Sequence, residues 1–135
     1  MEKVLSGKPI SILLNKAIVK IVNELNLKPK MLLIQIGSDP ASSYYVNSII
    51  NAGAKLGCNI ELFSMPKDTT QQALLTVLHN ANKDRDVHGI MIQKPLPKEI
   101  DENAVNLAIN PEKDLDALHP VNLGKILLET DGFIP

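Results

Sequence analysis

Three short stretches of the chain carry side chains suited to binding or catalysis. Tyr44 and Tyr45 stand together in PASSYYV, although aromatic residues make up only 3% of the 135 residues. Gln93 closes an apolar run and precedes two prolines in IMIQKPLP, and Asp114 and Asp116 alternate in EKDLDALHP. Phenols, amides and carboxylates bind polar ring systems and orient water or carbonyl groups, so these stretches are the candidates for a site.

Each stretch also has a structural interpretation, which the residues alone leave open. Tyr44 and Tyr45 lie about 100° apart around a helix, so one can face a cleft while the other packs, or both belong to an amphipathic surface. Gln93 either orients a water or carbonyl group or is a solvated strand end. Asp114 and Asp116 point the same way in an extended segment, where they would bind an amidine-like ring edge or a metal. Alternatively, they are turn residues that satisfy their own backbone.

Two further residues near these stretches are weaker candidates. His119 precedes Pro120 and is either a base or, more commonly for a lone histidine, structural. Lys94 follows Gln93 within the proline-rich loop and is by default a solvated cation. Its neighbourhood still suggests a hypothesis, that it brings an ammonium group to the site, although adjacent residues of an extended segment point opposite ways.

The composition excludes several classes of protein. The formal net charge is -1 and no basic stripe stands out, so a nucleic-acid partner is not expected. No apolar run approaches the ~20 residues of a membrane span, and the first residues do not resemble a signal peptide. The single cysteine, Cys58, excludes an internal disulfide and suits a cytoplasmic protein.

Helical and strand patterns alternate along the chain. The expected helices cover residues 10–25 and 40–57, a stretch capped by residues 68–70 and ending near 82, a short stretch from 101 to before 111, and 123–128. The expected strands cover residues 31–36, 60–64 and 88–93. This alternation predicts a three-layer α/β/α domain with a small, mostly parallel sheet and helices on both faces. Ligands of such sheets bind beyond the carboxyl ends of the strands, where the polar and proline-rich residues collect.

Several catalytic motifs are absent from the sequence. IGSDPAS holds one glycine, so neither usual glycine-rich phosphate loop is present, and no G-x-S-x-G nucleophile elbow occurs. The histidines His79, His88 and His119 lack metal-ligand spacing with any cysteine. We therefore expect no metal site.

Four stretches together resemble a known family. SGKPI, IGSDPASSYYV, GIMIQKPLP and INPEKDLDALHPVNLGK, in this order, are similar to the N-terminal domain of bifunctional methylenetetrahydrofolate dehydrogenase/methenyltetrahydrofolate cyclohydrolase. The resemblance implies that residues 1–135 form a folate-binding catalytic domain, like the first domain of amino-acid-dehydrogenase-like two-domain enzymes. It also implies that NADP is bound by a second, C-terminal Rossmann domain outside this chain. The reaction implied is one-carbon interconversion on tetrahydrofolate, with hydride transfer to NADP followed by hydrolysis to 10-formyltetrahydrofolate.

The resemblance assigns roles to four residues. Tyr45 matches the tyrosine that stacks on the aminobenzoyl ring, and Gln93 matches the glutamine beside the reacting carbon. We treat both as catalytic and substrate-binding. Asp116 matches the aspartate that grips the pterin edge, whose N–H donors suit a carboxylate. Pro95 is expected to contact the substrate.

The sequence departs from the family pattern at several positions. Ile49 stands where the family has a lysine, one turn after the tyrosine, that assists proton transfer in the cyclohydrolase step. An aliphatic side chain cannot do so, which places cyclohydrolase activity in doubt. Ala117 and Leu118 replace a usual glycine and a common phenylalanine, and Lys94 replaces a leucine.

The resemblance also implies a cellular location, a metabolic role and a set of partners. It implies a cytoplasmic, multifunctional oxidoreductase and hydrolase of one-carbon metabolism that serves purine biosynthesis. The partner is a small-molecule folate, with no nucleic acid or membrane, and the family forms homodimers. Two alternatives remain: a substrate domain of another two-domain dehydrogenase, such as the shikimate type, or a non-enzymatic folate-fold module that pairs with another chain.

Overall fold

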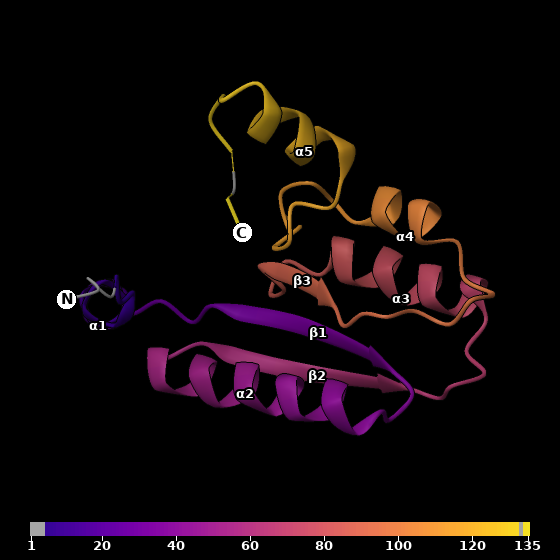
Figure 1. The fold of residues 1–135 in the computed structure, drawn as a ribbon, viewed down its shortest axis with the longest axis horizontal. Helices are drawn as coiled ribbons and strands as arrows, with labels where there is room; N and C mark the ends of the chain where they lie inside the picture. Colours follow the sequence, from indigo (N-terminus) through magenta and orange to yellow (C-terminus); the bar gives the residue numbers. More distant parts are fainter. Residues whose placement is uncertain (1–4, 133) are drawn as a thin grey trace.

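Three parallel strands form the centre of the fold. A computed structural model describes residues 5–132 and 134–135. Its helices are α1 (Lys8–Glu24), α2 (Pro40–Leu56), α3 (Gln71–Lys83), α4 (Glu102–Ala108) and α5 (Pro120–Leu127). Its strands are β1 (Lys30–Ile36), β2 (Asn59–Met65) and β3 (Gly89–Ile92). The strands are all parallel, in the order β2-β1-β3 (Figure 1), which confirms the predicted alternation of helices and strands.

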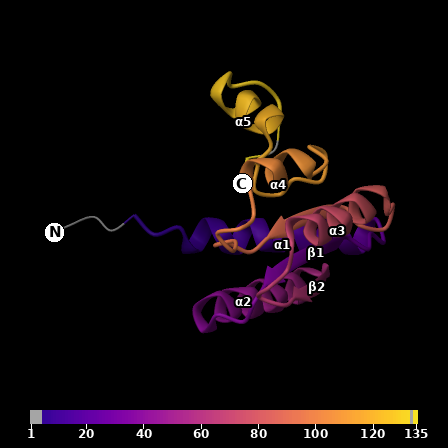
Figure 2. The ribbon, with the colours of Figure 1, turned by 90° about the vertical axis from the view of Figure 1, so that its right-hand side faces the viewer.

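The helices cover both faces of this sheet. Figure 2 shows α2 on one face and α3 on the other, with α4 beyond α3 and α5 farther out. The predicted three-layer α/β/α architecture is therefore confirmed. The chain passes from β1 through α2 to β2 on one side of β1, and then from β2 through α3 to β3 on the other side. Because both crossovers are expected to be right-handed and run in opposite directions across the sheet, they place α2 and α3 on opposite faces.

The core lies mainly between the sheet and α3. Leu32 pairs in register with Ile90, and Ile34 with Ile92, and all four side chains are buried against α3 residues such as Leu74. Because side chains alternate along a strand, the intervening positions lie on the opposite face, where Gln35 of β1 bonds to Ser43 of α2 and a Cβ on Gly89 of β3 would meet Leu115. This double coverage explains why β1 reads as a nearly continuous apolar run.

Local capping defines the helix ends. The side chain of Asp39 accepts a hydrogen bond from the backbone N–H of Ser42 at 2.9 Å and caps α2. Thr70 caps α3 by accepting from the N–H of Ala73, which confirms the expected cap within residues 68–70. The last helix, by contrast, begins at Pro120, three residues before the expected start, because proline suits the first helical position.

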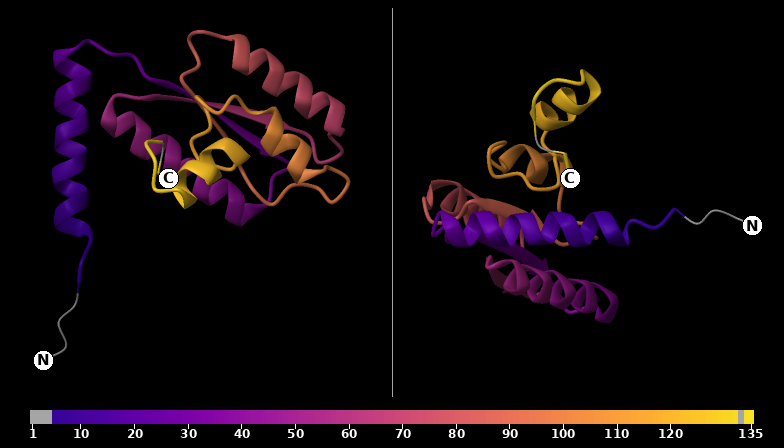
Figure 3. Two further views of the ribbon diagram at one scale, coloured as in Figure 1. Left: turned by 90° about the horizontal axis from the view of Figure 1, so that it is seen from above. Right: turned by 90° about the vertical axis from the view of Figure 1, so that its left-hand side faces the viewer.

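Helix α1 lies to the side of the sheet (Figure 3). It begins at Lys8, close to the expected start, but its apolar periodicity does not correspond to burial. Val22 is its buried residue, whereas the side chains of Ile10 and Leu13 are 63% and 68% exposed. Within residues 5–132, no helix is long and apolar enough to cross a bilayer.

Candidate functional site

A cleft of about 650 Å³ lies at the carboxyl edge of the sheet. Residues 37–39, which follow β1, form one wall, and residues 95–99, which follow β3, form the other. Gly37 adopts a positive φ of 77°, which turns the chain sharply from β1 towards α2. The cleft therefore lies where ligands of parallel sheets bind, and Pro95 is among its lining residues.

Gln93 extends β3 by one residue along β1. Its backbone N–H donates to the carbonyl of Ile34 at 2.8 Å, which places Gln93 beside Gln35. Both side chains therefore leave the sheet on the face that α2 covers. The Nε2 of Gln93 donates to the carbonyl of Lys94 at 2.7 Å, while its Oε1 is buried without a hydrogen-bond partner among the described residues. The amide thus presents a desolvated acceptor, as a group that orients a ligand requires.

Gln35 is a residue of this region that the sequence analysis missed. It is 5% exposed, and its Nε2 donates to the hydroxyl of Ser43 at 3.1 Å. This bond attaches the first turn of α2 to the end of β1, two residues before Tyr45. A glutamine inside the apolar run MLLIQI was the available signal, because an amide in a buried strand needs a partner.

Both tyrosines lie near the start of α2, as predicted, but neither is packed. Tyr44 is 81% exposed and Tyr45 is 52% exposed, which agrees with the alternative that both belong to an amphipathic surface. Val46, which is 1% exposed, is the residue of this turn that faces the sheet. Ile49 follows Tyr45 by one turn and is partly buried. Tyr45 is therefore accessible beside an aliphatic neighbour.

Asp114 and Asp116 have different environments. Asp114 forms a parallel bridge with Ile90 and is 1% exposed. Its carboxylate accepts from the backbone N–H groups of Leu118 and His119 and from the Nδ2 of Asn122. The turn interpretation is thus correct for Asp114, whereas Asp116 is only partly buried and remains a candidate ligand-binding group.

The charge of Asp116 depends on its surroundings. Burial raises the pKa of its carboxyl above the usual value, and the neighbouring charge of Asp114 raises it further, while the positive charge of Lys94 lowers it. The Nζ of Lys94 also pairs with the Oε2 of Glu102 at 2.5 Å. The carboxylate that pairs with Lys94 is thus on α4, while Lys94 itself follows Gln93 directly in the chain.

The remaining candidates are structural. His119 precedes α5, and its Nδ1 accepts from the N–H of Val121 at 3.2 Å, which makes it a helix cap. No group of three or more histidine, cysteine, aspartate or glutamate side chains within the described ranges is arranged to hold a metal ion.

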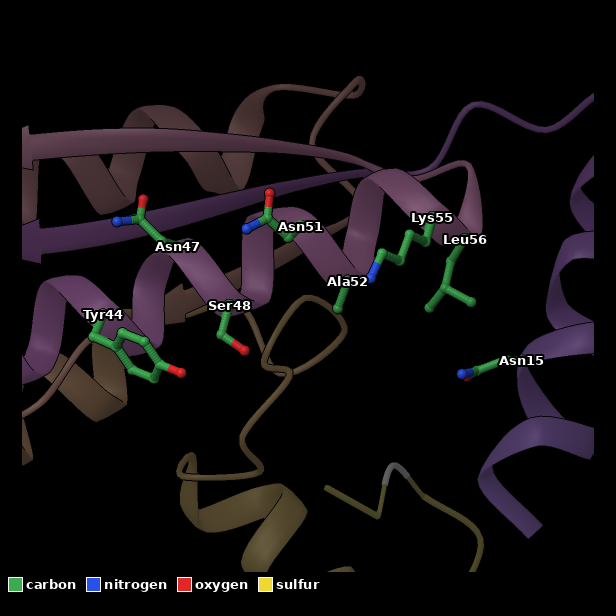
Figure 4. Close-up of a pocket in the computed structure, with 8 residues that line it drawn as sticks. All are labelled: Asn15, Tyr44, Asn47, Ser48, Asn51, Ala52, Lys55 and Leu56. Atoms are coloured by element: carbon green, nitrogen blue, oxygen red, sulfur yellow. The ribbon is translucent and has the colours of Figure 1, made fainter. Parts of the chain in front are cut away.

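A second hollow, of about 490 Å³, lies between α1 and the outer face of α2 (Figure 4). Its lining is mostly polar and includes Asn15, Tyr44, Asn51 and Lys55. Neither this hollow nor the carboxyl-edge cleft is lined by Tyr45, Gln93 or Asp116.

The fold and these polar groups define a small parallel α/β domain of the kind that binds a ligand at its carboxyl edge. Residues 5–116 match the family described as tetrahydrofolate dehydrogenase/cyclohydrolase, catalytic domain. The chain therefore belongs to this family, and not to the shikimate type considered above.

Individual relatives agree with this assignment. The chain is 43% identical to the bifunctional protein FolD of Acetivibrio thermocellus and 41% identical to that of Chlamydia trachomatis, over 98% and 97% of its length. It covers 48% and 46% of those proteins and so spans about half of their length.

Solved structures give the same result. A 5,10-methylenetetrahydrofolate dehydrogenase of the silkworm Bombyx mori superimposes with a TM-score of 0.94 at 31% identity, over 100% of this chain and 48% of that one. The bifunctional dehydrogenase/cyclohydrolase of Thermoplasma acidophilum superimposes with a TM-score of 0.90 at 34% identity, over 98% and 48%. The corresponding enzyme of Trypanosoma brucei, complexed with NADP cofactor and inhibitor, has a TM-score of 0.90 at 30% identity, over 98% and 47%.

Proposed function

We propose that this chain is the folate-binding catalytic domain of a methylenetetrahydrofolate dehydrogenase/methenyltetrahydrofolate cyclohydrolase. The family match over residues 5–116 is the observation that carries the proposal. The fixed amide of Gln93 adds to it, because its buried Oε1 is an acceptor suited to orienting a polar ligand. The substrate class is a tetrahydrofolate that carries a one-carbon bridge.

We assign four residues to substrate binding. Tyr45 offers an exposed phenol ring for stacking on the aminobenzoyl group. Gln93 lies beside the reacting carbon, and Asp116 accepts hydrogen bonds from the pterin edge. Pro95, which lines the carboxyl-edge cleft, contacts the bound ligand. Tyr45 and Gln93 are the proposed catalytic residues.

The described residues do not fit the pyrophosphate of NADP. The N-terminus of α2 follows β1, the usual place for a dinucleotide loop, but Asp39 already caps it, and this hydrogen bond holds the pKa of that carboxyl below its ordinary value. A carboxylate there repels a second anion. We therefore place NADP on residues outside this domain and assign this chain the binding and orientation of the folate.

Cyclohydrolase chemistry has less support than folate binding. The hydrolytic step needs a group that moves protons, and Ile49 offers none one turn after Tyr45. We propose that the domain binds and positions the folate for the dehydrogenase reaction, with hydrolysis slow. We further propose a cytoplasmic setting, a link to purine biosynthesis and a homodimeric enzyme, as in the family resemblance.

Matched tyrosine variants test the proposal. The probe is 5-formyltetrahydrofolate, and its dissociation constant is measured by calorimetry. Tyr45→Ala should weaken binding about tenfold because it removes an aromatic stacking surface. Tyr44→Ala removes an equally large but more exposed ring and should leave the dissociation constant unchanged. A folded protein that does not bind this reduced folate would refute the proposed function.

A further inference from the structure

Gln35 is a polar side chain at the buried end of the central strand β1. It is 5% exposed, and it follows the fully buried core residues Leu33 and Ile34. An amide buried beside apolar side chains costs free energy unless it is hydrogen-bonded, and an aliphatic residue could fill the same space without that cost. The hydrogen bond that the Gln35 amide makes therefore indicates what this residue contributes.

The bond from Gln35 reaches the helix that carries both tyrosines. Its Nε2 donates to the Oγ of Ser43 at 3.1 Å, and Ser43 lies in the first turn of α2, two residues before Tyr45. Side chains two residues apart on a helix point about 200° away from each other. Ser43 thus faces the sheet while Tyr45 faces outwards, and the bond holds this turn from its inner side.

The rest of α2 is held mainly by apolar packing. Its far half lies close against β2, where a Cβ on Gly53 would come within 2.3 Å of the Cγ1 of Ile60. Near its start, Val46 is 1% exposed and packs against the sheet. Packing is non-directional, whereas a hydrogen bond depends on both distance and angle. The bond between Gln35 and Ser43 therefore gives the start of α2 a directional attachment to β1.

The same end of β1 also fixes the candidate amide of the site. The carbonyl of Ile34 accepts from the backbone N–H of Gln93 at 2.8 Å, one residue before Gln35 in the chain. Two adjacent residues of one strand therefore support two parts of the proposed site. Ile34 holds Gln93 through the backbone, and Gln35 holds the turn of Tyr45 through its side chain.

We propose that Gln35 is a positioning residue of the folate site, whose hydrogen bond to Ser43 fixes the first turn of α2 on β1 and so directs the ring of Tyr45 relative to the amide of Gln93. This inference rests on the proposed function for the identity of the ligand. It does not require Gln35 to touch the ligand, because the residue acts through Tyr45.

The first test measures the dissociation constant for 5-formyltetrahydrofolate by calorimetry. Gln35→Leu removes the donor but keeps a side chain of similar size, and it should weaken binding about two- to tenfold, as expected for one lost hydrogen bond. Ser43→Ala removes the same bond at a partly exposed position, so it should give the same loss without altering the core. Ser43→Thr keeps the hydroxyl and should bind like the parent. Gln72→Leu makes the same exchange at an exposed position of α3 and should change nothing.

A double-mutant cycle separates the positioning of Tyr45 from a general loss of stability. In a Tyr45→Ala background, Gln35→Leu should cause no further loss of affinity, because the ring that the bond directs is gone. An undiminished loss in that background would overturn the proposal. Parent-like affinity of both Gln35→Leu and Ser43→Ala, with only the free energy of unfolding reduced, would overturn it as well.

A measurement without ligand distinguishes this inference from the proposed function. The hydrogen exchange of the Tyr45 backbone amide is followed by NMR in the parent, Gln35→Leu and Ser43→Thr. Exchange should be about threefold faster or more in Gln35→Leu, because the first turn then opens more often, and unchanged in Ser43→Thr. The amide of Gly53, in the far half of α2, should keep its rate in all three proteins.

The two failures give different results. If the protein binds no reduced folate, the proposed function fails, whatever the exchange rates are. An unchanged exchange rate of the Tyr45 amide in Gln35→Leu refutes the role of Gln35, whether or not folate binds.

Discussion

The Nδ2 of Asn122 donates to the Oδ2 of Asp114 at 2.9 Å, and both side chains are 1% exposed. This buried pair joins the segment beside β3 to the first turn of α5. Asp116, two residues beyond Asp114, is accessible by comparison. The two carboxylates of one short motif thus have separate roles, one in stability and one in the candidate site.

The first prediction compares these two aspartates. Asp114→Ala leaves two backbone N–H groups and the Asn122 amide without their acceptor, so it should lower the free energy of unfolding by about 3 kcal/mol. Asp116→Ala should change it by less than about 1 kcal/mol and instead weaken folate binding. Urea unfolding and ligand titration of both variants check the assignment, which equal losses of stability would contradict.

The second prediction concerns pH. The pKa of Asp116 is raised in the folded protein, mainly by burial, above the ordinary value of 3.8. The folded state then binds more protons than the unfolded state above that pH, so Asp116 makes stability fall as pH rises from about 4 through its raised pKa. Asp116→Asn should remove this contribution, and the exposed Asp131→Asn should not. The urea concentration at the midpoint of unfolding is measured from pH 4 to pH 7 for the parent and both variants. The prediction is wrong if the midpoint of Asp116→Asn changes with pH as that of the parent does.

The third prediction compares two helical glycines. A Cβ on Gly53 of α2 would lie 2.3 Å from the Cγ1 of Ile60, whereas a Cβ on Gly124 of α5 has no heavy atom within 4 Å. Gly124→Ala should therefore stabilise the protein by about 0.5–1 kcal/mol through helix propensity. Gly53→Ala should destabilise it by about 1–3 kcal/mol through overpacking. Thermal unfolding of both variants provides the comparison, and a stabilised Gly53→Ala would contradict the packing described.

The fourth prediction concerns the position after Tyr45. Ile49→Lys introduces an ammonium group one helical turn along the same face, so cyclohydrolase turnover of 5,10-methenyltetrahydrofolate should rise by about 10²-fold or more. Ile50→Lys is the matched control, because it places the same side chain on a different face. Turnover is followed by the loss of methenyl absorbance in the full enzyme. Equal rates for both variants would count against the assigned role of this helix face.

Much of the fold could be predicted from sequence, because apolar runs and apolar periodicity depend on residues that are close together in the chain. The run MLLIQI marked a strand buried on both faces, and β1 is the central strand. The start of α5 was misplaced because Pro120 and His119 form a cap that apolar spacing does not reveal. The apolar face of α1 predicted the helix but not its exposure, since periodicity reports which side is apolar and not what covers it.

The candidate site was less predictable, because its properties depend on contacts distant in sequence. Asp114 and Asp116 look equivalent in EKDLDALHP, and only the bridge to Ile90 and the bonds from the following turn distinguish them. The partner of Lys94 is Glu102, eight residues away on another element. The hydrogen bond of Gln35 to Ser43 could not be predicted, because it depends on where the first turn of α2 lies relative to the end of β1. The shared location of Tyr45, Gln93 and Asp116 in one ligand site stays a prediction.

The strand order has a consequence for how the domain assembles. β1 pairs with β2 on one side and with β3 on the other, and the chain that separates β1 from β3 is about twice as long. Contacts between distant segments form later in folding because closing the longer loop costs more entropy. We therefore expect β1, α2 and β2 to form an early unit onto which β3 docks. Gln93 arrives with that late strand, so an incompletely folded chain lacks the fixed amide of the candidate site.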